Sequence, residues 1–215
     1  MMAKAGRIAP RIDLHRLEES FCSQLATGSV YDARFTGSLP PLHSARGQRV
    51  ALMGCALEHV SITDMNAQGL LLSDVRIAHS DLANMNGAGC TFERVEIFET
   101  RLTGANFSEA RWKSVLFREC RLDLCMLRMA VTENCVFENC VLSQADLYGA
   151  DLGGAVFCGS NLAQADLGAC RLAGADLRHC RLDGVRGKPA DMEGLTISPD
   201  QASLLITLFG IRVAS

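Results

Sequence analysis

Ten cysteines in a chain of 215 residues are the first candidates for chemistry, because clustered thiols can bind zinc, form disulfides or act as nucleophiles. No C-x-x-C spacing, the usual sign of a zinc site, occurs in the sequence. Eight of the ten instead recur at intervals that are multiples of five: Cys55, Cys90, Cys120, Cys125, Cys135, Cys140, Cys170 and Cys180. Ala or Ser fills the same position elsewhere, so we expect these thiols to be core filler and predict no metal site and no cofactor.

The five-residue interval extends well beyond the cysteines. Every fifth residue from Leu52 to Leu182 gives 27 positions, and all but Ala67, Gly87 and Thr132 are large and apolar. The residue two places before each is nearly always small or β-branched, and no charged residue falls in either set. Five helical steps advance about 500°, and five strand steps reverse the face, so neither element can use this spacing. The chain must therefore turn at every repeat, with the large side chains facing a common axis.

A second interval of twenty residues links Phe117, Phe137 and Phe157, which indicates four repeats per coil. Coils stacked at the strand spacing of roughly 4.8 Å would form a rod on the order of 30 Å long. Residues twenty apart then become neighbours. Cys120 and Cys140 are accordingly the pair in the array most able to approach disulfide distance, although a cytoplasmic chain would keep them reduced.

Several repeats carry a more specific signature: Ala145-Asp146-Leu147, Ala150-Asp151-Leu152, Ser160-Asn161-Leu162, Ala165-Asp166-Leu167 and Ala175-Asp176-Leu177. This pattern resembles the A(D/N)LXX motif of pentapeptide-repeat proteins. The resemblance covers about 135 residues, with Val, Met or Cys in place of the preferred Ala in the N-terminal half. It implies an all-β fold, a right-handed quadrilateral β-helix with one repeat per side and here a short C-terminal helix.

The array predicts five segments. Residues 1–22, with apolar residues among charged ones, are expected to form an N-terminal cap. Residues 23–37 hold the first repeats in a different phase, and residues 38–49 form a loop rich in Pro and Gly. That loop is either a recognition element or a splice between the cap and the array. Residues 50–184 form the β-helix, and residues 185–215 form a C-terminal cap and helix, the expected dimerisation region.

The C-terminal helix has a clear start signal. Ser198-Pro199-Asp200-Gln201 reads as a capping box with proline at the first helical position, and the helix is expected to run to Gly210, with a short strand at 211–213. Its apolar residues are too many for one stripe, so some should close the solenoid and the rest meet a second copy. The quinolone-resistance branch ends in a similar stretch and forms dimers there, which implies a homodimer. The expected interface is Leu204, Leu205, Leu208 and Phe209.

Polar columns on the outside have two interpretations. His59 and His79 are neighbours on one outer face and could bind a metal, but without a nearby third ligand they favour a solvated ladder. Asn66, Asn86 and Asn106 form a second column and predict an amide hydrogen-bond ladder.

The excess of acidic residues in the array is the sequence feature that suggests a function. The array has 17 acidic and 11 basic residues, and between 129 and 170 the acids have no basic residue beside them in the sequence. These candidate partner-binding residues are Glu133, Glu138, Asp146, Asp151 and Asp166. A narrow negative rod resembles a DNA duplex to a protein that grips DNA. The alternative is that these charges only keep the rod soluble.

A filled solenoid offers no cleft for catalysis, and the sequence has no phosphate-binding loop, so we expect no enzyme activity. No export signal or apolar span is present, which favours a cytoplasmic location, and a net charge of -3 disfavours direct nucleic-acid binding. The resemblance implies a protein partner such as DNA gyrase, protected from inhibitors. A scaffold for another partner is the alternative, and metal buffering by the thiols is a third. The scaffold hypothesis is motivated by apolar residues at outward positions: Leu71, Phe98, Leu116, Met126 and Met129.

Overall fold

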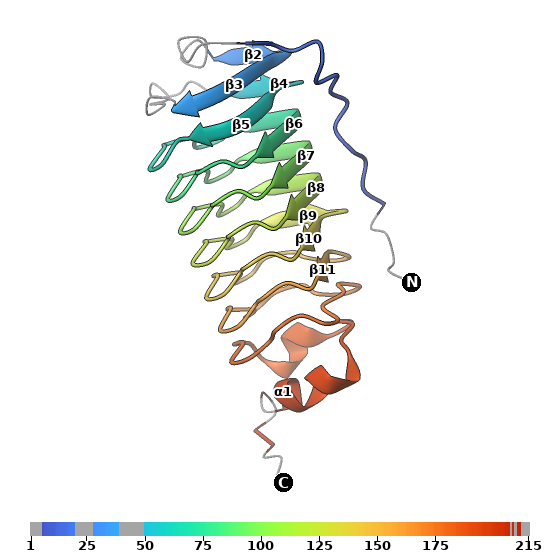
Figure 1. The fold of residues 1–215 in the computed structure, drawn as a ribbon. Coiled ribbons are helices and arrows are strands. Elements are labelled where there is room, and N and C mark those ends of the chain that lie inside the picture. The colour runs from blue at the N-terminus through green and yellow to red at the C-terminus, as the bar shows by residue number, and fades with distance from the viewer. Residues whose placement is uncertain (1–5, 20–27, 39–49, 207, 209, 212–215) are drawn as a thin grey trace.

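The protein is a four-sided rod of stacked coils in a computed structural model that describes residues 6–19, 28–38, 50–206, 208 and 210–211. Figure 1 shows the strands stacked in chain order, with the short C-terminal helix at the far end. The predicted fold class, a pentapeptide-type β-helix, is confirmed. The predicted loop falls almost wholly outside the described residues, as do Phe21 and Phe209.

All strands pair in parallel within one sheet system. The long strands β6 (Leu71–Ala78), β7 (Thr91–Phe98) and β8 (Arg111–Arg118) each cover two sides of a coil. The others are shorter: β1 (Glu18–Glu19), β2 (Ser29–Tyr31), β3 (Ala33–Ser38), β4 (Ala51–Met53), β5 (Ala56–Ser61), β9 (Val131–Glu133), β10 (Val136–Glu138) and β11 (Val156–Cys158). The remaining sides are held by isolated parallel bridges with the same twenty-residue offset, such as Asn66 to Asn86.

The register between coils follows from the sequence period. Phe92 pairs with Trp112, and Phe117 pairs with Phe137, each twenty residues on. In the first coil the offset is 22, since Val30 pairs with Leu52. The two additional residues account for the different phase of the N-terminal repeats.

The turn at each repeat has a backbone cause. The second residue after each large apolar residue has a positive φ, for example 54° at His59 and 56° at Ser114. This left-handed conformation bends the chain at every corner. Glycine adopts it without strain, as at Gly104, where an added Cβ would also lie 2.6 Å from Asn84 Oδ1.

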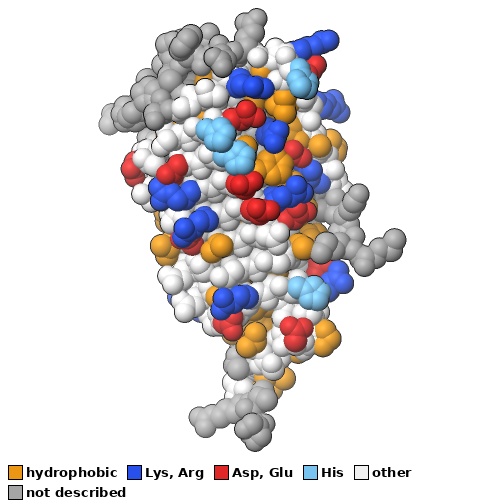
Figure 2. Space-filling view, viewed as in Figure 1, with side chains coloured by type: hydrophobic (Ala, Val, Ile, Leu, Met, Phe, Trp, Pro, Cys, Tyr) orange, Lys and Arg blue, Asp and Glu red, His pale blue; other side chains and the backbone are white. Residues whose placement is uncertain are grey.

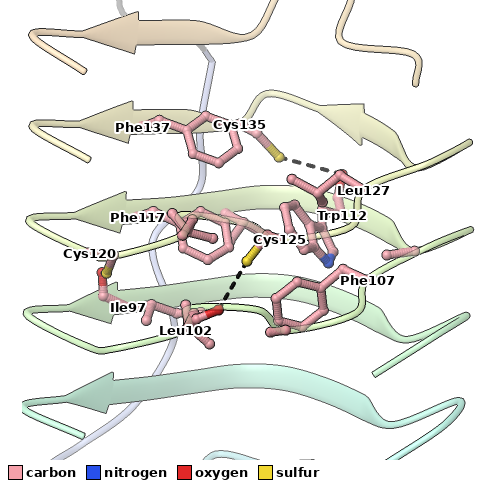
Figure 3. Close-up of a cluster of buried hydrophobic side chains, with 14 of the residues drawn as sticks. Ile97, Leu102, Phe107, Trp112, Phe117, Cys120, Cys125, Leu127, Cys135 and Phe137 are labelled. Carbon is pink, nitrogen blue, oxygen red and sulfur yellow. Dashed lines mark hydrogen bonds between the residues drawn. The ribbon is translucent and has the colours of Figure 1, made fainter. Parts of the chain in front are cut away.

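The core is a single column of apolar side chains along the axis. Its largest members are aromatic: Phe117, Phe137 and Phe157 stack with ring centroids 5.1 and 4.5 Å apart. Figure 3 shows Phe117 and Phe137, with Trp112 and Phe107 beside them. Two exceptions in the apolar set have local explanations. Thr132 donates its hydroxyl to the carbonyl of Asp151 at 3.2 Å, and the space a side chain at Gly87 would take is filled by the Phe107 ring.

The C-terminal end starts with the 3-10 helices η2 (Pro189–Met192) and η3 (Pro199–Gln201), followed by α1 (Ala202–Ile206). The capping box at Ser198 is confirmed, since the Ser198 N–H donates to Gln201 Oε1 at 2.7 Å. The helix is shorter than predicted because α1 ends at Ile206, and Ile211 is not in a strand.

The described part of the predicted N-terminal cap, residues 6–19, contains no helix. Apart from β1, which pairs with β3, this segment lies on the outside of the rod and runs along it.

Candidate partner-binding surfaces

The eight cysteines at the small inward position are part of the core. All eight array cysteines at the small inward position are buried, as predicted. Several of their thiols donate to carbonyls of the preceding coil: Cys125 donates to Leu102 at 3.0 Å and Cys135 to Trp112 at 3.6 Å (Figure 3). Burial raises the pKa of Cys125 and of Cys135 to about 12. A thiol that stays protonated is a poor nucleophile and a poor metal ligand.

Cys120 and Cys140 lie on adjacent coils as expected, and both are free thiols. The hydrogen bond between them, followed by burial, raises the pKa of Cys140. Both side chains are buried in the core. Among the described residues, no group of three or more His, Cys, Asp and Glu side chains is placed to hold a metal ion.

The histidine column lies in a shallow groove on the outside of the rod. The rings of His59 and His79 stack with centroids 5.0 Å apart, and His79 Nδ1 lies 3.4 Å from Glu99 Oε2. Glu119 and Arg121 also line the groove. The arrangement is a stacked polar ladder open to solvent.

The asparagine column is the amide ladder that the sequence predicts. Asn86 donates to Asn66 Oδ1 and Asn106 donates to Asn86 Oδ1, each at 3.2 Å. Met126 takes the next position of this column and is 40% exposed. The ladder therefore ends at an apolar side chain.

The five candidate acids are not unpaired, which corrects the expectation that they lack basic companions. Each lies within ion-pair distance of a base, four of them twenty residues away on the neighbouring coil. The pairs are Glu133 with Lys113 at 3.0 Å, Glu138 with Arg118 at 2.6 Å, Asp146 with Arg128 at 3.0 Å, Asp151 with Arg171 at 3.5 Å and Asp166 with Arg186 at 3.7 Å. The sequence carried this signal in the same twenty-residue interval that places the core. Figure 2 shows positive and negative side chains side by side on one face of the rod.

Other acids do lack an ion pair. Within the described ranges, Asp32, Asp64, Glu109 and Glu119 form none in the earlier coils, and neither do Asp191, Glu193 and Asp200 near the C-terminal end. Uncompensated negative charge therefore lies outside the five candidates, both in the earlier coils and at the C-terminal end.

An exposed apolar patch occupies the middle of the rod. Of the outward apolar residues picked from the sequence, Met126 and Met129 are exposed, Leu71 and Phe98 are half-buried, and Leu116 is buried. The guanidinium groups of Arg76 and Arg118 lie 5.2 and 5.5 Å from the centroid of the Phe98 ring. The sequence interpretation missed three neighbours of the two methionines. The full patch is Leu124, Met126, Met129, Val131 and Tyr148, from 39% to 58% exposed.

The four candidate dimer residues have different environments. Leu205 is buried at 8% exposure, and Leu208 packs against the core, so both close the end of the solenoid. Leu204 is 40% exposed, and Phe209 lies outside the described residues.

Part of the chain matches a known protein family. Residues 120–159 and 150–186 match the family model for pentapeptide repeats, with eight copies. This segment of the chain is built of pentapeptide repeats. A search among curated proteins finds no match.

Two solved structures illustrate the fold. Full-length QnrB1, a plasmid-mediated fluoroquinolone resistance protein, is 19% identical with a TM-score of 0.54, over 90% of this chain and 95% of that one. HetL, a pentapeptide repeat protein involved in heterocyst differentiation regulation from Nostoc sp. strain PCC 7120, is 17% identical with a TM-score of 0.44, over 79% and 86% of the two chains. QnrB1 thus shares the fold over nearly its whole length. In the described part of this chain, no helix is long and apolar enough to cross a membrane.

Proposed function

We propose that this protein is a non-catalytic binding rod that engages a type II topoisomerase such as DNA gyrase and protects it from inhibitors. The observation that carries the proposal is a rod whose axis is packed with apolar side chains, apart from an apolar cavity of about 40 Å³ among the core residues from Val50 to Phe107, so a protein partner meets its outer surface. QnrB1, which has this fold along nearly its full length, is a fluoroquinolone resistance protein. A topoisomerase grips duplex DNA, and a negative rod can occupy the same positively charged surface.

The charge of the rod supports this partner class through its sum. The array has 17 acidic and 11 basic residues, an excess of six acids (17 − 11). Exposed ion pairs contribute little to the long-range field, because opposite charges nearly cancel beyond a Debye length of about 8 Å. The field therefore comes from the excess acids, and the five candidate residues contribute to it only together with their bases.

We expect the full-length protein to reduce inhibition of gyrase supercoiling by a fluoroquinolone. Replacing the five candidate acids with their amides removes five negative charges and leaves their bases uncompensated, so it should abolish the effect. The matched control is Glu138→Gln with Arg118→Gln, which removes one ion pair and leaves the net charge unchanged, so it should retain the effect. The measurement is supercoiling with and without drug. No change in supercoiling or drug sensitivity at micromolar protein would remove the proposal.

We also propose a homodimer through the C-terminal end, as in the branch that the sequence resembles. Leu204 is the candidate contact, because Leu205 already serves the core. Leu204→Asp should give a monomer by light scattering and leave the melting temperature nearly unchanged. Leu205→Asp should instead unfold the cap, because it buries a charge against apolar side chains. A monomeric parent protein at high concentration would contradict the dimer.

A second candidate function, a scaffold for a different protein, is favoured by the apolar patch around Met126 and Met129. Methionine side chains adapt to differently shaped apolar partners. Affinity capture that returns only topoisomerase subunits would exclude this candidate.

A further inference from the structure

The N-terminal strap, defined here as residues 6–17, lies against one corner of the rod. This strap corner is the column Asp74, Arg94, Ser114 and Asn134, where each coil turns between its two strand-bearing sides. Arg11 contacts Asp74, and the Cα of Gly6 faces Asn134 three coils further on. Five residues that cross three coils are nearly fully extended. Figure 1 shows this segment running alongside the stacked strands.

Three polar contacts hold the strap to the corner. Arg7 Nη2 lies 2.8 Å from Glu96 Oε1, and the backbone N–H of Arg11 donates to Asp74 Oδ1 at 2.9 Å. Arg34 Nη2 donates to the carbonyl of Leu14 at 2.7 Å. The corner thus binds the side chain of Arg7, the backbone N–H of Arg11 and the backbone carbonyl of Leu14. Two of the three contacts do not depend on the side chain of the bound segment.

The corner is also arranged independently of the strap. Asp74 accepts two hydrogen bonds from Arg94, each 2.7 Å long, and these hold the pKa of Asp74 below its usual value. The carboxylate that receives the Arg11 N–H is therefore ionised and fixed in place. A receptor group that is already oriented lowers the entropic cost of binding.

Burial shows how far the strap covers the rod. Leu116 points outward yet is only 3% exposed, whereas Val136 and Val156, which follow it in the same column, are partly exposed. Ser114 on the same coil is 1% exposed. The strap therefore covers apolar and polar surface that an uncovered repeat presents to solvent.

The fit of the strap is incomplete. Three of the four buried polar side-chain atoms without a hydrogen-bond partner in the described part of the chain lie at or beside it: Arg7 Nη1, Arg34 Nε and Arg76 Nε. A buried donor without a partner destabilises the arrangement that buries it. Ile8 within the strap is 51% exposed. These features describe a bound peptide with imperfect complementarity.

We propose that the strap corner is a binding site for an extended, arginine-bearing peptide, which the protein's own N-terminus occupies until a partner with such a segment displaces it. The site selects arginine through Glu96 and an extended backbone through Asp74 and Arg34. This proposal stands without the proposed topoisomerase interaction.

The test uses the full chain and a fluorescent peptide with the sequence of residues 6–17. The parent protein should bind the peptide weakly, because the tethered strap competes at high effective concentration. Arg7→Glu in the chain loosens the strap and should tighten peptide binding by about tenfold or more. Glu96→Arg should abolish peptide binding, and a peptide with Arg7→Glu should restore binding to the Glu96→Arg chain.

Trypsin cleavage after Arg11 reports on the strap itself. Either single variant should speed this cleavage by about tenfold, and the double variant Arg7→Glu with Glu96→Arg should return it to the parent rate. Glu109→Arg, a charge change on an acid outside the strap corner, is the matched control and should alter neither readout. Equal peptide binding by the parent, Arg7→Glu and Glu96→Arg chains, or cleavage rates that do not follow the charge swap, would overturn the proposal.

Discussion

We expect Gln201→Ala to lower the free energy of unfolding of the C-terminal cap by about 3 kcal/mol, because this side chain joins the cap to the last complete coil. Gln201 is 2% exposed, and its Nε2 donates to the carbonyls of Leu177 at 2.8 Å and Cys180 at 2.7 Å. Its Oε1 accepts from the N–H of Ser198. Alanine removes the partner of the Ser198 N–H and of the Cys180 carbonyl, and one of the two hydrogen bonds that the Leu177 carbonyl accepts. Hydrogen exchange of the amides from 177 to 206 measures the loss.

Two variants separate this explanation from a general effect of mutating the cap. Gln201→Glu keeps the acceptor for Ser198 but loses both donated hydrogen bonds, so it should be nearly as destabilising. Asp200→Ala changes the exposed neighbour and should cost under about 1 kcal/mol. Unchanged exchange rates in Gln201→Ala would mean that the cap is held by apolar contacts alone.

We expect Phe137→Ala to lower the free energy of unfolding by about 4 kcal/mol. Phe137 is 1% exposed and lies between Phe117 and Phe157, with ring planes inclined by 2° and 4°. Removing the middle ring takes away its own burial and one face of contact from each neighbour. Because coils stabilise one another only through adjacent contacts, the loss should weaken the whole central array. Chemical denaturation followed by circular dichroism measures it.

Phe137→Leu is the control for this prediction, since leucine fills the same inward position in many other repeats. It should cost about 1 to 2 kcal/mol, because the rod keeps an apolar side chain but loses the stack. Equal destabilisation by alanine and leucine would show that ring stacking, and not volume, stabilises the column.

The core was predictable from the sequence because a five-residue period has only one geometric solution. Large apolar residues at every fifth position force a turn at each repeat, and the twenty-residue interval places Phe137 between Phe117 and Phe157. The same interval predicted the Asn66 to Asn106 ladder, since stacked amides satisfy one another. Burial of the eight cysteines followed from their position in the repeat.

The surface was less predictable because the ion pairing and burial of outward side chains depend on residues that are distant in the sequence. Glu138 has no base beside it in the sequence, yet Arg118 lies directly across the coil boundary. Leu116 has the position of an exposed residue and is buried, because a segment more than a hundred residues earlier returns to this corner. The left-handed corners also tolerate non-glycine residues such as Met129, so residue type alone did not mark them.

Equilibrium binding of the full-length protein to purified DNA gyrase, with duplex DNA as competitor, tests the central claim most directly. We predict saturable binding that weakens as the salt concentration rises. Duplex DNA should displace the protein, because the rod and the duplex would share one positively charged surface of gyrase. Absence of binding at about 10 μM protein, or binding that duplex DNA leaves unchanged, would contradict it.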